Sequence, residues 1–242
     1  MPNFKLLLVS NKVNILIALL FLVYPILAKS VVNVDKTRVV FKSGDFSQTL
    51  TLHNSEKQPT LIQIWTDYGD PFVTPDKVST PVFVSPSIFR MNPGEIRTIK
   101  IFYEKSDRYQ QYEESIYWLN IYQIPPNTNL LTDGKHKLIV PLKIRLKVFL
   151  RPEGVQDVSY SDYLKVTFER ISSNVVRITN PTKWYITLPQ VNIGSNKLTS
   201  IMIPPNKYHD IQVHNVILNG MKVDYVFVDD LGMSHSNTGS LN

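Results

Sequence analysis

The residues best suited to acid–base or metal chemistry are five histidines and one pair of adjacent glutamates. The histidines are scattered along the chain, at His53, His136, His209, His214 and His235. His209-Asp210 with His214 is the one grouping that resembles a metal site. On a strand, however, residues five apart point to opposite faces, and the same holds for the adjacent Glu113 and Glu114. No local motif marks a Ser-His-Asp arrangement, so neither a catalytic nor a metal site is predicted.

The composition excludes several large classes of protein. The chain of 242 residues has no cysteine, which rules out disulfides, Cys-ligated zinc, iron–sulfur clusters and a cysteine nucleophile. Its 9 glycines are never closer than seven positions apart, so G-x-G-x-x-G, the P-loop and G-x-S-x-G are all absent. We therefore expect no enzyme and no cofactor.

The first thirty residues are typical of an export signal. Lys5 and Lys12 precede an uncharged apolar run, Val13–Ala28, which is shorter than the ~20 apolar residues of a membrane span. Ala28-Lys29-Ser30 offers small residues where a signal peptidase cleaves. We expect residues 1–30 to be removed, leaving an exported protein without a stable membrane anchor. The net charge of +6 includes three lysines of this segment, and the remaining +3 on residues 31–242 does not indicate nucleic-acid binding.

The rest of the chain predicts an all-β fold. The expected strands are Val31–Val40, Ser47–His53, Leu61–Thr66, Thr98–Tyr103, Ile116–Ile121, Leu138–Phe149, Tyr163–Phe168, Val175–Thr179, Trp184–Pro189, Ile211–His214 and Lys222–Val228. Sixteen prolines argue against long helices. Arg151-Pro152-Glu153-Gly154 indicates a hinge between two β-sandwiches of immunoglobulin size, residues 31–152 and 153–242.

The most informative strand is Leu138–Phe149. Apolar side chains alternate along it with Lys143, Arg145 and Lys147, which is period two over twelve residues. Such alternation also occurs in ordinary core strands. Pro141 favours an edge strand or a bulge, because proline cannot donate to a β-ladder. A long apolar edge aggregates unless something pairs with it, and strand addition to a partner is its natural use.

Several motifs, in order along the chain, resemble those of the periplasmic pilus (fimbrial) assembly chaperones, the PapD-like family. Asp35-Lys36-Thr37-Arg38 resembles the D-[KR]-T-R signature of the first strand. The other matching segments are Pro81–Pro86 with Phe89–Gly94, Glu114–Asn120 with Ile124–Pro126, Ile144–Pro152, and Asn180–Thr182 with Tyr185. The resemblance covers nearly all of the chain after residue 30.

The resemblance implies a boomerang of two immunoglobulin-like β-sandwich domains that binds incomplete pilus subunits in the periplasm. The chaperone would lend a strand to the subunit by donor-strand complementation, and an outer-membrane usher would receive the complex. Leu138, Val140, Leu142 and Ile144 match the donor strand. Arg38 and Lys147 match a basic pair that holds the C-terminal carboxylate of the subunit. Glu114, Arg151 and Asp230 match an interdomain ion-pair network.

Some features depart from the pattern or leave alternatives open. Glu113 stands where many members have Asp-Arg before Glu-Ser, and Pro141 interrupts the donor strand. The modest loop between Pro126 and Leu138 favours the short-loop branch, which handles rod-forming pili. Self-association of the free protein remains open. The alternatives are a secreted structural or adhesive β-sandwich protein and a secreted hydrolase, for which no clustered catalytic residues are present.

Overall fold

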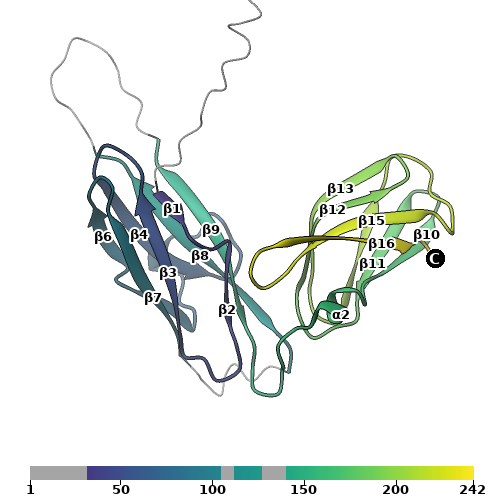
Figure 1. The fold of residues 1–242 in the computed structure, drawn as a ribbon, viewed down its shortest axis with the longest axis horizontal. Helices are drawn as coiled ribbons and strands as arrows, with labels where there is room; N and C mark the ends of the chain where they lie inside the picture. Colours follow the sequence, from purple (N-terminus) through teal and green to yellow (C-terminus); the bar gives the residue numbers. More distant parts are fainter. Residues whose placement is uncertain (1–31, 105–111, 127–139) are drawn as a thin grey trace, which may run out of the picture. The chain divides into compact units, whose positions relative to one another are not determined.

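The computed structural model describes residues 32–104, 112–126 and 140–242, and nearly all of its regular structure is β (Figure 1). The strands form two sandwiches, each made of two sheets around its own apolar core. The prediction of an all-β protein with two immunoglobulin-like domains is therefore confirmed.

In its described residues, the first domain contains nine strands and one short 3-10 helix. These are β1 (Val32–Val34), β2 (Arg38–Phe41), β3 (Ser47–Asn54), β4 (Thr60–Asp67), η1 (Pro75–Lys77), β5 (Val82–Ser85), β6 (Ile88–Met91), β7 (Ile96–Tyr103), β8 (Ser115–Ile124) and β9 (Leu142–Leu150). One sheet has the order β1-β3-β7-β5 and the other β2-β9-β8-β4-β6. Alternate residues of both sheets, such as Leu50, Ile99 and Leu119, are fully buried between them.

The segment predicted as one strand, Val31–Val40, is two strands in different sheets. β1 pairs with β3, whereas β2 pairs in parallel with β9. Asp35 lies between the two strands, and its carboxylate accepts the Thr51 N–H at 3.0 Å. This side chain takes a ladder position of β3, so the chain leaves the first sheet there and joins the second.

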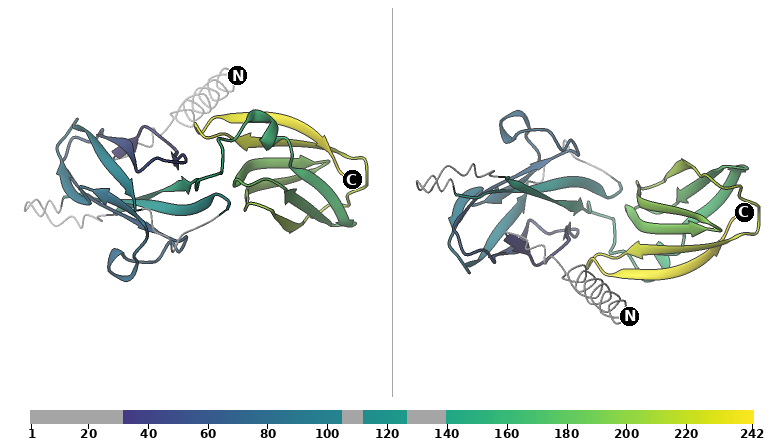
Figure 2. Two further views of the ribbon diagram at one scale, coloured as in Figure 1. Left: turned by 90° about the horizontal axis from the view of Figure 1, so that it is seen from below. Right: turned by 90° about the horizontal axis from the view of Figure 1, so that it is seen from above.

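The second domain contains seven strands and one helical turn. These are α2 (Tyr160–Tyr163), β10 (Thr167–Ser172), β11 (Val175–Asn180), β12 (Ile186–Ile193), β13 (Asn196–Ile203), β14 (Lys207–Gln212), β15 (Lys222–Val228) and β16 (Ser234–Ser240). Its sheets have the orders β10-β11-β14 and β13-β12-β15-β16. β15 and β16 form a hairpin whose strands lie side by side in every view (Figures 1 and 2).

Several predicted strands have different bounds in the structure. Trp184–Pro189 corresponds to β12, Ile211–His214 to β14 and Ile116–Ile121 to the longer β8. Two further differences have a clear physical cause. Residues Tyr163–Phe168 were expected to be extended, but α2 ends at Tyr163 and β10 begins at Thr167. The Asp162 carboxylate accepts the Ser159 N–H at 2.9 Å and so caps this helical turn. The strand predicted as Leu138–Phe149 begins at Leu142, because Pro141 has no N–H to donate to β8, and it continues to Leu150.

Candidate functional site

One edge of β9 is open over half of its length. β8 pairs with β9 from Leu142 to Leu150, but β2 pairs only with its second half, Lys147–Leu150. Within the described part of the chain, no strand pairs with the remaining edge, Leu142–Leu146, which we call the donor edge. Its backbone groups are therefore available to a further strand.

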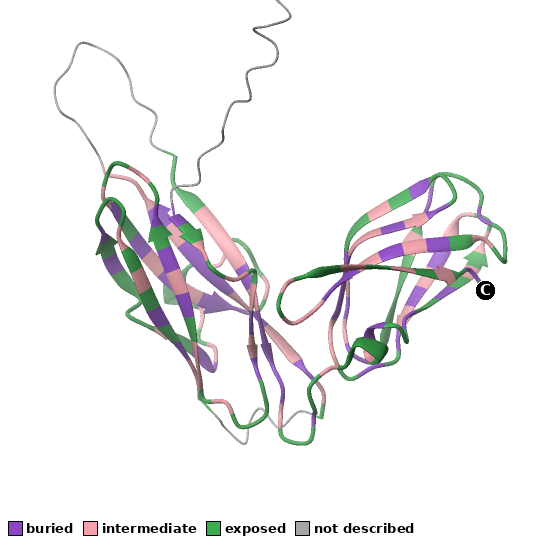
Figure 3. Ribbon diagram, in the orientation of Figure 1, coloured by how far each residue is buried: buried purple, intermediate pink, exposed green. Residues whose placement is uncertain are grey.

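The apolar face of β9 passes gradually from the core into solvent. Leu146 is buried, and Ile144 is partly buried against the core of the first domain. Leu142 is 41% exposed, and Val140, which lies just before the strand, is 67% exposed. Figure 3 shows this change from exposed to buried along β9. Leu138, the fourth predicted donor residue, lies outside the described residues.

Arg38 and Lys147, which we call the anchor pair, are direct neighbours across the parallel ladder of β2 and β9. Register partners project from the same face of a sheet, so the two cations lie side by side. Their face is opposite to the one that carries Leu146 and Val148 into the core. The pair therefore stands at the end of the donor edge, where β2 begins.

The hydrogen bonds of the anchor pair go to neutral groups of the second domain. Arg38 Nη1 donates to the Val228 carbonyl at 3.4 Å, and Lys147 Nζ donates to Thr187 Oγ1 at 3.3 Å. Arg38 Nε is buried without a hydrogen-bond partner. In residues 32–104, 112–126 and 140–242, neither cation forms an ion pair.

Burial perturbs both members of the anchor pair. It lowers the pKa of Arg38 from its ordinary value, and burial together with the charge of Arg38 lowers the pKa of Lys147 to about 8. Lys147 Nζ also lies 5.9 Å from the ring centroid of Trp118, its register partner on β8. Asp230, Asp229 and Glu114 act on Arg38 through space, but within the described residues neither cation makes an ion pair. Two such adjacent, partly desolvated cations are suited to bind an anion.

The other predicted charges gather around the buried side chain of Arg151. Arg151 Nε donates to Glu114 Oε1 at 2.9 Å, and its Nη2 donates to Asp230 Oδ1 at 2.7 Å. A further carboxylate, Asp157 Oδ1, lies 3.3 Å from Arg151 Nη1. Together these four residues are the hinge cluster. The Arg151 side chain is 1% exposed, and its planar fork binds three acceptors at once.

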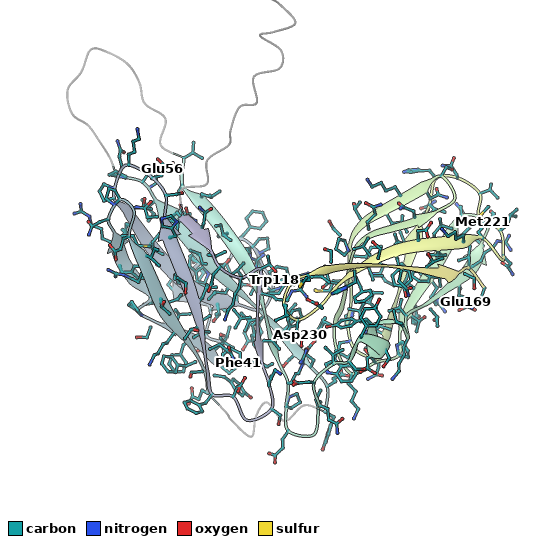
Figure 4. All side chains as sticks on the ribbon, viewed as in Figure 1. Phe41, Glu56, Trp118, Glu169, Met221 and Asp230 are labelled. Atoms are coloured by element: carbon teal, nitrogen blue, oxygen red, sulfur yellow. The ribbon has the colours of Figure 1, made fainter. Side chains whose placement is uncertain are left out.

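Each member of the hinge cluster lies at the end of a strand or on the link between the domains. Glu114 precedes β8, Arg151 follows β9, and Asp230 lies in the turn between β15 and β16, where Figure 4 labels it. The second oxygen of Glu114 accepts the Tyr185 N–H at 2.8 Å. Burial raises the pKa of Glu114 to about 7, against the opposing effects of Arg151 and this N–H.

Sequence reasoning missed the partners that the second domain supplies. Thr187 and the Val228 carbonyl contact the anchor pair, and Asp157 joins the hinge cluster. Thr187 lies two residues after Tyr185, next to a motif that was recognised, so its position was the one available signal. A backbone carbonyl carries no signal in the sequence, and Asp157 resembles any solvated acid.

Comparison with protein families covers most of the chain. Residues 31–156 match the family described as pili and flagellar-assembly chaperone, PapD N-terminal domain. Residues 161–239 match the family described as pili assembly chaperone PapD, C-terminal domain. The chain belongs to the PapD family of pili assembly chaperones. The resemblance seen in the sequence motifs is thereby confirmed.

Individual members of the family are similar over almost their full length. The chaperone protein FimB/FhaD of Bordetella pertussis is 29% identical over 212 residues, which cover 85% of this chain and 86% of the relative. The probable fimbrial chaperone YadV of Escherichia coli K12 is 28% identical over 209 residues, 82% of this chain and 85% of the relative. The crystal structure of YadV matches with a TM-score of 0.73 and 26% identity, covering 88% of this chain and all of YadV.

A structure of a complex shares the fold. The Salmonella enterica SafB chaperone, solved with the SafA pilin, matches with a TM-score of 0.72 at 22% identity and covers 88% of this chain and 99% of its own.

Within the described residues, no three His, Asp or Glu side chains are grouped so that they could hold a metal ion. No helix of that part is long and apolar enough to cross a membrane.

Proposed function

We propose that this chain is a periplasmic chaperone that binds pilus subunits by donor-strand complementation. The observation that carries the proposal is the continuity of three features along β9. The open donor edge offers backbone groups, and the apolar face from Val140 to Ile144 emerges from the core. The strand leads to two cations that make no ion pair in the part of the chain that the structure describes. An incomplete β-sandwich with a missing strand would use all three.

The position of the anchor pair also supports one direction for the bound strand. β2 is parallel to β9 and begins at Arg38, beside Lys147. A strand that lies along Leu142–Leu146 in line with β2 must end before Arg38. Its C-terminal carboxylate meets the anchor pair only if that strand runs in the same direction as β9. We therefore infer that the terminal strand of the subunit pairs in parallel with β9.

The two parts of the site have different roles in binding. Burial of Val140, Leu142 and Ile144 in a subunit groove contributes roughly 1.5–3 kcal/mol for each side chain, before ordering and desolvation costs. Charge-assisted hydrogen bonds to the carboxylate contribute about 1.5–3 kcal/mol each. The groove thus supplies most of the affinity. The anchor pair selects the register, because a one-residue slip would turn the apolar face outward.

The proposed function also involves an outer-membrane usher, a location in the periplasm and contacts between copies of the free protein. An outer-membrane usher would receive the chaperone–subunit complex, as the family resemblance implies. Export by residues 1–30 would place the protein in the periplasm. An open apolar edge favours aggregation, so we expect the free protein to shield β9 by self-association. No catalytic group, cofactor or nucleic acid has a part in this function.

The test is recovery of subunits from the native host. Tagged mature protein and its Lys147→Ala variant are expressed there, and the proteins that copurify are identified by mass spectrometry. We expect small β-rich subunits with the unaltered protein and none with the variant. If neither protein retains such subunits while they are being produced, the proposed function is wrong.

A further inference from the structure

Thr187 lies on the outer face of β12, where strand alternation predicts an exposed residue, yet it is buried. Its neighbours Ile186 and Leu188 are 1% and 0% exposed and belong to the core of the second domain. Alternation along a strand places Thr187 on the opposite, outer face. It is nevertheless only 9% exposed, and its Oγ1 lies 3.3 Å from Lys147 Nζ of the first domain.

The Thr187 hydroxyl has one hydrogen left to donate. A hydroxyl carries one donor and two acceptor positions, and here Oγ1 accepts from the Lys147 ammonium. Within the described residues, the hydroxyl hydrogen has no acceptor. A buried hydroxyl without an acceptor is unfavourable, and an anion held by Lys147 would provide one.

Lys147 needs such a partner more than Arg38 does. A lysine side chain is a flexible stem with a point charge, whereas the planar fork of arginine keeps its donors in fixed directions. The ring of Trp118 lies beside the Lys147 ammonium but accepts no directional hydrogen bond of ordinary strength. In the described residues, Thr187 Oγ1 is the hydrogen-bond acceptor that fixes where this ammonium lies.

We propose that Thr187 is a positioning residue of the anion site, which holds the Lys147 ammonium and offers its own O–H as a third donor to the carboxylate of the subunit. This inference rests on the proposed function. It assigns the second domain a direct part in recognising the subunit terminus. The first domain supplies the cations, and β12 of the second domain holds the Lys147 ammonium in place.

The test compares two probes on four proteins. The probes are a short peptide with alternating apolar residues that ends in a free carboxylate, and the same peptide ending in an amide. The proteins are the full mature chain and its Thr187→Val, Thr187→Ser and Thr199→Val variants. Thr199 is an exposed threonine on β13 and serves as the matched control. Binding is measured by isothermal titration across a range of pH.

We expect Thr187→Val to weaken binding of the free acid by roughly threefold to tenfold, the equivalent of one hydrogen bond. Binding of the amide should not change. Thr187→Ser keeps the hydroxyl and should retain the preference for the acid, as should Thr199→Val. Loss of the acceptor should also move the decline of acid binding with increasing pH to a lower pH in Thr187→Val, a shift that a merely structural role would not cause.

The outcomes distinguish a failure of the proposed carboxylate anchor from a failure of the proposed role of Thr187. If the unaltered protein does not prefer the acid over the amide, the proposed carboxylate anchor is wrong, and the role of Thr187 is wrong with it. If it does prefer the acid and Thr187→Val keeps the full preference and the same pH profile, the role of Thr187 alone is refuted. Should Thr187→Val fail to fold, Thr187→Ala removes the same hydroxyl and is expected to give the same selective loss.

Discussion

Replacing Lys147 by methionine separates a binding role from a structural one. The change keeps the length of the stem beside Trp118 and removes the charge next to Arg38. One charge-assisted hydrogen bond to a carboxylate contributes about 1.5–3 kcal/mol, so affinity for the subunit or for a free-acid peptide should fall roughly 10- to 150-fold. Affinity for the amidated peptide should stay the same.

The folding stability of Lys147→Met should not decrease. Burial and the adjacent Arg38 lower the pKa of Lys147 to about 8, which means that the folded protein disfavours the charged form. Removing that charge relieves repulsion, so thermal unfolding at neutral pH should occur at the same temperature or a higher one. Lys143→Met is the matched control. Lys143 lies on the same face of β9, over the ring of Trp65 and away from the anchor pair, and its loss should leave acid binding intact.

The reasoning is refuted if Lys147→Met melts several degrees lower with no change in acid binding. A loss of 1 kcal/mol corresponds to about 2–4 °C in a chain of this size. Such a result would make Lys147 part of the scaffold that joins β9 to Thr187. Equal weakening of acid and amide binding would also contradict an anchor for the carboxylate.

Three further predictions follow from burial and charge. Val140→Asp should abolish subunit recovery and shift the melting temperature little, because Val140 is 67% exposed, and a large loss of thermal stability would mark it as core. Raising the pH through about 8 should weaken acid binding, because Lys147 loses its proton. Between about pH 8 and 10.5, the contribution of Lys147 to folding stability should increase with pH, because the unfolded chain holds a proton that the folded chain has lost. A binding curve that is flat across this range contradicts the role of Lys147 in the anion site. Arg151→Met should destabilise by about 3–5 kcal/mol in denaturant unfolding, since it leaves Glu114 and Asp230 without their cation, and a change below 1 kcal/mol would show that the cluster is dispensable.

Glu114→Gln should remove a pH dependence that the unaltered protein has. The folded pKa of Glu114 is raised from 4.5 to about 7, so between these values the folded chain holds a proton that the unfolded chain has released. The unaltered protein should therefore gain stability relative to Glu114→Gln as the pH falls from 7 to 4.5, by an amount of the order of 1–3 kcal/mol. Parallel stability curves for the two proteins over this range would disprove the raised pKa.

The sequence predicted most of the longer alternating strands, but it missed β5, β6, β13 and β16. β3, β7 and β15 alternate buried and exposed residues, and their predicted positions agree with the structure within two residues. β16, Ser-His-Ser-Asn-Thr-Gly-Ser, has no apolar residue and was missed. It lies at the edge of its sheet and is stabilised by its ladder with β15 in the same hairpin, a pairing that its polar composition does not indicate.

The family motifs predicted the residues of the candidate site, whereas their contacts and their burial could be obtained only from the structure. Arg38 and Lys147 are more than a hundred positions apart, and nothing local indicates that they are neighbours in a parallel ladder. Their hydrogen bonds to Thr187 and to the Val228 carbonyl depend on how the second domain meets the first. Pattern alone also placed Pro141 inside the strand, whereas the strand begins after it.

The structure of β9 explains how one strand can serve both a stable domain and a partner. Its C-terminal end is fixed from three directions, by β8, by β2 and by the hinge cluster that holds Arg151 directly after the strand. Its N-terminal end is held by β8 alone and carries the exposed Leu142. The anchor pair lies at the boundary between the fixed C-terminal half of β9 and its open N-terminal half. In the proposed function, a partner strand would add to the free half without disturbing the fixed half, and its terminal carboxylate would meet cations that the rest of the protein already holds in place.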